Sequence, residues 1–114
     1  MNRGEVWTVA CGKDYAGKPR PVVIVQDDRF DMTKSIAVCA LTTNPTDAPL
    51  FRLLVQPDEE NGLRAECRIM ADKIITVPRT KLGIRVGRLS DEDMVRLSRV
   101  LLVFFGIGGP SARA

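Results

Sequence analysis

The sequence predicts an α+β protein, mainly β, in which short strands form a small β-barrel and one C-terminal helix packs against it. Two patterns indicate this class. Short apolar runs rich in β-branched residues alternate with turn residues, and a helical apolar repeat occurs only at the end of the chain. The length of 114 residues suits one domain with a single core. We therefore expect residues 1–114 to form one domain, with about 106–114 as a flexible tail.

The first half of the chain carries three predicted strands. Residues 4–9 alternate polar and apolar side chains, as a half-buried strand does. Residues 21–26 are a nearly continuous Val/Ile run that we expect to be buried on both faces, and residues 35–42 read as a further buried strand. The segments 10–19 and 27–33 between them read as connections, the second with room for a helical turn.

The second half continues with strands that end in turns. Residues 51–55 and 66–77 are strand-like, and we expect the longer one to bend near residues 71–73. Asn61-Gly62 marks a tight turn, because a positive φ is easy there. Residues 80–89 read as a short turn followed by an edge strand.

The last predicted element is a helix that docks on the barrel. Ser90 and Asp93 resemble a capping box with aspartate in place of the usual glutamate. Four apolar side chains recur at helical spacing and make one face: Met94, Leu97, Leu101 and Phe104. Gly106 is expected to end the helix.

Composition narrows the chemistry that the chain can perform. It contains no histidine, which excludes a two-histidine ribonuclease mechanism, a Ser-His-Asp triad and the usual histidine metal sites. Catalysis would have to use Arg, Lys, Thr, Ser, Asp or Glu side chains. The net charge of +3 and the isoelectric point near 9.0 favour an anionic partner.

The spacing of the cysteines and the hydropathy of the chain indicate its cellular compartment and whether it binds a metal. Cys11, Cys39 and Cys67 are widely spaced without a C-x-x-C pair, which predicts neither a disulfide framework nor a zinc site. Cys39 and Cys67 fall in strand-like runs and are expected to be buried thiols. No signal-peptide pattern and no apolar run near the ~18 residues of a membrane span occurs. We expect a cytoplasmic protein without metal or cofactor.

Arg20 stands between Pro19 and Pro21 at the start of an apolar run. Each proline fixes its own φ and pushes the residue before it toward extended geometry, so Arg20 is held on a stiffened backbone. A cation held in this way is a candidate active-site residue. The alternative, a strand-edge charge in solvent, stays open at this point.

Five blocks of sequence span nearly the whole chain in a fixed order. They are residues 3–7 (RGEVW), 20–26 (RPVVIVQ), 41–44 (LTTN), 72–77 (DKIITV) and 82–89 (LGIRVGRL). Together with the terminal helix, this ordered set resembles the MazF/PemK toxin family. The resemblance implies an SH3-like barrel of the CcdB/PemK type that forms a homodimer. It also implies a metal-independent, sequence-specific endoribonuclease, an mRNA interferase, that is neutralised by a cognate antitoxin.

The resemblance also assigns residues to the site. Arg20 matches the catalytic arginine of the family, and Thr42 matches the catalytic threonine. Asp72 matches a position that is commonly acidic, and it could act as the base or orient Arg20 as an ion pair. Met70 stands where some members carry an arginine, so a cation at that position is missing here.

These residue types suit RNA cleavage by the neighbouring 2′-hydroxyl, which leaves 2′,3′-cyclic phosphate and 5′-hydroxyl ends. The phosphorane-like transition state gathers negative charge on its non-bridging oxygens, and a guanidinium meets it with a planar fork of donors. The hydroxyl of Thr42 adds a neutral donor. Because arginine is a poor base, we expect Arg20 to stabilise charge or to donate a proton to the leaving oxygen, and the base stays unassigned.

The expected substrate is single-stranded RNA, because the reaction needs a 2′-hydroxyl and sequence reading of RNA requires unstacked bases. Messenger RNA is the first expectation, with rRNA and tRNA as alternatives. The candidate RNA-binding residues are basic or polar: Lys13, Lys18, Thr43, Asn44, Arg79, Lys81 and Arg85. A merely solvated charged face is the alternative for these side chains.

Two other functions fit the same barrel. One is a non-enzymatic toxin that poisons DNA gyrase, as CcdB proteins do, and the other is a plain interaction module. The pair Arg20 and Thr42 favours the endoribonuclease, because a pure binding protein does not need it.

Overall fold

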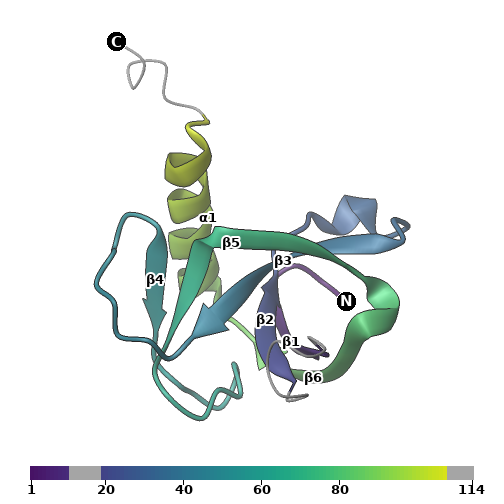
Figure 1. Ribbon diagram of the computed structural model, residues 1–114, viewed down its shortest axis with the longest axis horizontal. Helices are drawn as coiled ribbons and strands as arrows, with labels where there is room; N and C mark the ends of the chain where they lie inside the picture. Colours follow the sequence, from purple (N-terminus) through teal and green to yellow (C-terminus); the bar gives the residue numbers. More distant parts are fainter. Residues whose placement is uncertain (11–18, 108–114) are drawn as a thin grey trace.

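The computed structural model describes residues 1–10 and 19–107, which fold into a six-stranded antiparallel sheet and one long helix (Figure 1). The strands are β1 (Glu5–Val9), β2 (Arg20–Ile24), β3 (Ser35–Thr42), β4 (Arg52–Val55), β5 (Cys67–Pro78) and β6 (Leu82–Arg88). The helix α1 is Asp91–Phe105, and two 3-10 turns are η2 (Asp28–Phe30) and η3 (Arg79–Lys81). Cys11, Lys13, Lys18 and residues 108–114 of the expected tail lie outside the described residues.

The sheet has the strand order β4-β5-β3-β2-β1-β6, so β4 and β6 form its edges. The predicted edge strand at residues 80–89 is therefore confirmed as β6, preceded by the turn η3. The central strand β2 is buried on both faces as predicted, with Val22, Val23 and Ile24 all at most 2% exposed. These three residues follow one another, so neighbouring side chains enter different cores.

Two apolar clusters fill the two sides of the sheet. The first lies under the helix and contains Val6, Val23, Cys39, Leu41, Leu53, Val55, Cys67, Ile69, Leu89 and Leu97. The second contains Val9, Val22, Ile24, Ile36, Val38, Val77 and Leu82. Cys39 and Cys67 are both buried and free of disulfides, which confirms the prediction of core thiols.

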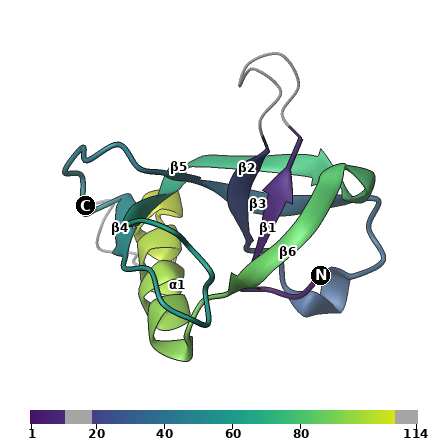
Figure 2. The ribbon, with the colours of Figure 1, turned by 90° about the horizontal axis from the view of Figure 1, so that it is seen from below.

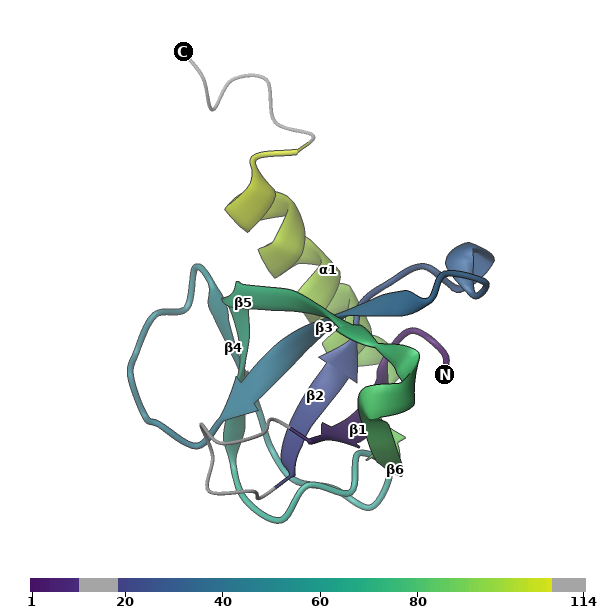
Figure 3. The ribbon, with the colours of Figure 1, turned by 45° about the vertical axis from the view of Figure 1, so that its right-hand side comes forward.

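Strand β5 bends sharply against β3, as the sequence predicts. Cys39 pairs with Ile74, whereas Leu41 pairs with Ile69, so a short advance along β3 spans a much longer stretch of β5. The extra residues form an irregularity that increases local curvature. Figure 3 shows β5 turning across the sheet at this place. This curvature gives the sheet the form of the predicted SH3-like barrel with its C-terminal helix.

Helix α1 begins and ends where the sequence predicts. The Oγ of Ser90 accepts a hydrogen bond from the backbone N–H of Asp93 at 3.1 Å, which satisfies one donor of the first turn. Gly106 ends the helix with φ of 67°, a left-handed conformation that glycine adopts without strain. Leu97 is fully buried in the first core, and α1 lies against β4 and β5 (Figure 2).

The predicted turn at Asn61-Gly62 also packs the loop between β4 and β5 against the sheet. Gly62 has φ of 69°, and Asn61 is fully buried. The side chain of Asn61 donates to the carbonyl of Gln56 and accepts from the backbone N–H groups of Asp58 and Leu63. A buried amide with these partners holds the loop between β4 and β5 against the sheet.

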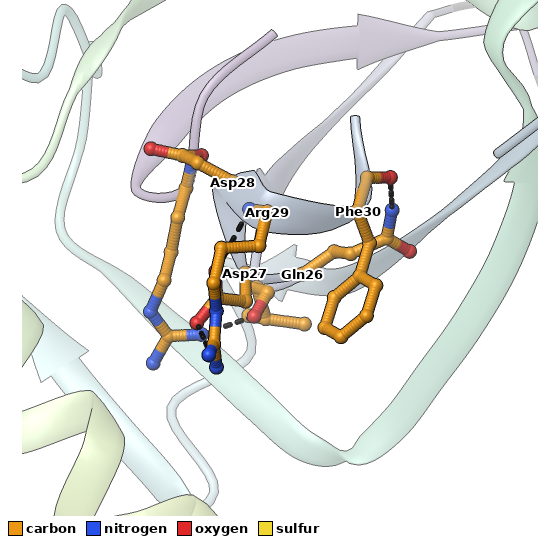
Figure 4. A network of polar contacts seen from close by, with 7 residues as sticks. Gln26, Asp27, Asp28, Arg29 and Phe30 are labelled. Carbon is orange, nitrogen blue, oxygen red and sulfur yellow. Dashed lines mark hydrogen bonds and ion pairs between the residues drawn. The ribbon is translucent and has the colours of Figure 1, made fainter. Parts of the chain in front are cut away.

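A polar network braces the connection from β2 to β3 (Figure 4). Asp27 caps η2 by accepting from the backbone N–H of Arg29 at 2.8 Å, and it also forms an ion pair with the Arg29 guanidinium. The side-chain amide of Gln26 donates to the carbonyl of Phe30 at 2.8 Å. These contacts give the predicted helical turn a defined conformation.

Candidate functional site

A cavity of about 660 Å³ opens where β2 begins and β3 ends. Figure 3 shows that the two antiparallel strands have these ends on the same side of the sheet. The lining residues are Val9, Ala10, Arg20, Val22, Ala40, Leu41, Thr42, Met70, Ile75, Val77, Pro78 and Lys81. Most of them are apolar, and three carry a polar or charged side chain.

Strand register explains why Arg20 and Thr42 meet in this cavity. Val22 pairs with Ala40 across β2 and β3. Continuing that antiparallel register by two residues on each strand brings Arg20 opposite Thr42, and the two-residue step keeps both side chains on the cavity face. Arg20 and Thr42, which are far apart in the sequence, thus line the same cavity. The structure brings this predicted pair together.

The hydroxyl of Thr42 acts as an acceptor, which leaves its hydrogen atom available for donation. Its Oγ1 accepts from the backbone N–H of Asn44 at 3.1 Å. Since a hydroxyl can accept and donate at once, the O–H of Thr42 can point to a substrate oxygen in the cavity. The exposed residues Thr43 and Asn44 follow in the loop after β3, where Asn44 Oδ1 accepts from Thr46.

Asp72 lies outside the lining of the cavity. Its Oδ2 is 3.2 Å from Nη2 of Arg52, and the two side chains are 23% and 16% exposed. Asp72 is thus paired with an arginine of β4, whereas the sequence suggested either a base or a partner for Arg20. No pattern in the sequence singled out Arg52.

The predicted RNA-binding cations occupy different places. Lys81 lines the cavity together with Arg20. Arg79 donates to the carbonyl oxygens of Phe30 and Thr33, so its guanidinium is engaged in holding η3. Arg85 forms an ion pair with Glu5, with its Nε 3.2 Å from Oε2.

The pKa of the Glu5 carboxyl group is strongly lowered. Burial by itself raises the pKa of this carboxyl, but hydrogen bonds from the Trp7 indole N–H and the Asn2 backbone lower it. The N-terminal ammonium and Arg85 act in the same direction, and the resulting pKa is about 2. Glu5 is therefore a charged structural anchor at the β1–β6 pair.

Two further properties of the described residues concern ligands and membranes. Within residues 1–10 and 19–107, no group of three or more His, Cys, Asp and Glu side chains is arranged to hold a metal ion. In the same part of the chain, no helix combines the length and apolar character that a membrane crossing requires.

The family model for the PemK-like, MazF-like toxin of type II toxin–antitoxin systems matches residues 2–105. The chain belongs to this toxin family. The resemblance in the sequence blocks is thereby confirmed, and so is the fold that it implied.

Curated relatives from mycobacteria agree with membership of the PemK/MazF family. A probable endoribonuclease MazF of Mycolicibacterium smegmatis is 53% identical over 109 residues, which cover 96% of this chain and 100% of the relative. Endoribonuclease MazF9 of Mycobacterium tuberculosis is 30% identical over 111 residues, covering 89% of this chain and 92% of the relative.

Solved structures share the PemK/MazF fold at lower identity. An endoribonuclease from a mycobacterial species, solved in complex with its cognate antitoxin, superposes with a TM-score of 0.78 at 23% identity and covers 96% of this chain and 99% of that chain. A MazE–MazF structure from Deinococcus radiodurans has a TM-score of 0.74 at 14% identity, covering 95% of this chain and 97% of that chain.

Proposed function

We propose that this chain is the endoribonuclease toxin of a type II toxin–antitoxin system. It cuts single-stranded RNA at specific sequences without a metal ion, by attack of the 2′-hydroxyl on the neighbouring phosphorus. The products carry 2′,3′-cyclic phosphate and 5′-hydroxyl ends. The observation that carries this proposal is the convergence of Arg20 and Thr42 on one cavity, in a chain of the PemK/MazF family.

The proposed roles follow from the charge that develops on phosphorus. The guanidinium of Arg20 binds the non-bridging oxygens as they gain negative charge, and the Thr42 hydroxyl donates a further hydrogen bond. The described lining of the cavity is mostly apolar, so few other side chains compete for hydrogen bonds with these donors. For Asp72, the ion pair with Arg52 supports a positioning role over the role of base.

The proposed substrate is an unpaired RNA strand, with mRNA first and rRNA and tRNA as alternatives. The Met70, Ile75 and Val77 side chains offer the apolar surface on which a base next to the cut phosphate can rest. Thr43 and Asn44 lie beside the cavity in the loop after β3 and are proposed to contact the RNA. Lys13, Lys18, Arg79 and Arg85 stay proposed phosphate contacts.

We further propose a homodimer in the cytoplasm that is neutralised by a cognate antitoxin. Exposed apolar side chains at the end of α1 support a surface that another protein covers: Leu102, Val103, Phe104, Phe105 and Ile107. A similar endoribonuclease has been solved in complex with its cognate antitoxin, which supports an antitoxin as the partner of this chain. Light scattering after size-exclusion chromatography tests the dimer, which requires twice the chain mass of 12.6 kDa.

Incubation of the purified protein with a long single-stranded RNA in EDTA tests the proposed reaction. Discrete fragments are expected, and sequencing their 5′ ends defines the cut site. A parallel assay measures DNA gyrase supercoiling. Intact RNA together with inhibited supercoiling would replace the endoribonuclease with a gyrase-poisoning toxin on the same fold.

A further inference from the structure

Few of the described residues that line the cavity of Arg20 and Thr42 can donate a proton. None of its described lining residues carries a carboxyl group, and the chain has no histidine. Among the described lining residues, the side-chain protons that can exchange are those of the Arg20 guanidinium, the Thr42 hydroxyl and the Lys81 ammonium. As a class, lysine ammonium groups lose a proton more readily than guanidinium or alcohol groups. Lys81 is therefore the lining side chain best suited to protonate a leaving oxygen.

The backbone places Lys81 across β1 from Arg20. The N–H of Ala10 donates to the carbonyl of Lys81 at 3.4 Å, and the next residue, Leu82, pairs with Val9 of β1. Val9 pairs on its other side with Arg20 of β2. The two cations therefore face one cavity from opposite sides of the end of β1, Arg20 from the start of β2 and Lys81 from the turn η3 just before β6.

The turn that carries Lys81 is braced by the segment after β2. The backbone N–H of Arg79 donates to the carbonyl of Lys34 at 3.0 Å, and its guanidinium donates to the carbonyl of Phe30 at 3.2 Å. The same Phe30 carbonyl accepts from Gln26 in the network of Figure 4. A braced turn limits the positions that the Lys81 ammonium can reach, as a catalytic group requires.

The charge of Lys81 has no carboxylate partner in the part of the chain that the structure describes. Arg79 and Arg85 were predicted to contact RNA together with Lys81. In the structure, the guanidinium of Arg79 donates to the carbonyl of Phe30, and that of Arg85 forms an ion pair with Glu5. Lys81 thus combines a position in the cavity with an ammonium that substrate can engage.

We propose, on the basis of the proposed RNA cleavage, that Lys81 is the general acid of the reaction. The 2′-oxygen forms a bond to phosphorus while the bond from phosphorus to the 5′-oxygen breaks. The 5′-oxygen takes a proton from Nζ of Lys81, and the proton of the 2′-hydroxyl passes to water. Lys81 regains its proton from solvent before the next turnover. Arg20 keeps its charge throughout and stabilises the phosphorane.

A substrate with sulfur in place of the leaving oxygen tests this role, because a thiolate leaves without protonation. The probe is an RNA oligonucleotide with the wild-type cut site and a bridging 5′-phosphorothiolate at the cut, compared with the all-oxygen oligonucleotide. Single-turnover rates are measured for wild type, Lys81→Ala, Arg20→Ala and Lys73→Ala. Lys73 is a matched control, since it is an exposed lysine of β5 that does not line the cavity.

Lys81→Ala should cut the all-oxygen RNA about 100-fold more slowly than wild type and the sulfur RNA at nearly the wild-type rate. Arg20→Ala should stay slow on both, and Lys73→Ala should match wild type on both. An equal loss for Lys81→Ala on the two substrates, or no loss on either, overturns the assignment of the general acid. Absence of any cleavage by wild type contradicts the proposed function itself.

Discussion

The guanidinium of Arg52 lies 3.2 Å from the carboxylate of Asp72 and ties the edge strand β4 to the bend of β5. Arg52 also pairs in register with Met70, whose side chain lines the cavity. The ion pair therefore joins two strands next to a residue that lines the cavity. We therefore expect Asp72 to act on the shape of the site and not on the substrate.

Replacing Asp72 with Asn should lower stability more than it alters the chemistry. We expect the free energy of unfolding to fall by about 1–3 kcal/mol, because Arg52 would keep a half-buried charge without its counter-ion. The pH–rate profile of RNA cleavage should keep its wild-type shape. A double-mutant cycle with Arg52→Gln in urea unfolding measures the pair. Loss of an acidic limb in the Asp72→Asn profile would instead make Asp72 the base.

Substitution of Arg20 should abolish cleavage while the fold persists. Arg20→Ala removes the donors that meet the phosphorane, so kcat should fall by at least about 100-fold. Arg20→Lys should recover little, since an ammonium cannot reproduce the planar fork. Arg20 is exposed at the start of β2, so its substitution should leave the fold intact. Circular dichroism and the thermal midpoint of unfolding serve as the folding control. Full activity of Arg20→Ala would refute the assigned site.

The hydroxyl of Thr42 should matter for rate and not for RNA affinity. Thr42→Val keeps the side-chain shape and removes the donor, so we expect kcat to fall about 10- to 100-fold. Thr42→Ser keeps the hydroxyl and its bond from the Asn44 N–H, and it should retain most of the activity. Binding is measured with an RNA that carries 2′-O-methyl groups and cannot be cut. A wild-type rate for Thr42→Val would rule out a role for the hydroxyl.

Glu5 should make the protein sensitive to acid. Because the pKa of Glu5 is lowered from 4.5 to about 2 on folding, its contribution to stability is fully present above pH 4.5. This contribution is lost as the pH falls toward 2, and we expect it to be about 1–3 kcal/mol. Urea unfolding of wild type and Glu5→Gln at pH 7 and pH 2.5 measures the difference. The two proteins should differ clearly at pH 7 and much less at pH 2.5, with the exposed Glu59→Gln as control.

The buried thiols should be inert until the protein unfolds. Burial raises the pKa of Cys39 to about 12 and also raises the pKa of Cys67, so thiolate is scarce at both sites near neutral pH. In a Cys11→Ser variant, Ellman's reagent at pH 8 should find no reactive thiol in the native protein. Two thiols should react in denaturant. Rapid labelling of the native variant would contradict the burial of these residues.

Local patterns predicted the elements of this fold well. The β-branched run before Gln26, the cap at Ser90 and the break at Gly106 each depend on residues within a few positions, and all three are found where expected. The bend of β5 was also predicted from its sequence. These features depend on short-range propensity and burial pattern, which a single sequence carries.

The site was only partly predictable, because long-range register decides it. The resemblance to the family singled out Arg20 and Thr42, but their meeting depends on the β2–β3 pairing of Val22 with Ala40. No local signal distinguishes Lys81 in the cavity from Arg79, which is engaged with the β2–β3 connection. The partner of Asp72 depends likewise on the pairing of β4 with β5.

The most direct test of the central claim uses one RNA oligonucleotide with the mapped cut site in two forms. One form is all-ribose, and the other has a single 2′-deoxy sugar just before the cut phosphate. Wild-type protein in EDTA should cut the first into fragments with 2′,3′-cyclic phosphate and 5′-hydroxyl ends, as identified by mass spectrometry, and leave the second intact. Cleavage of the deoxy form, or products with 5′-phosphate ends, would contradict cleavage by the 2′-hydroxyl at Arg20 and Thr42.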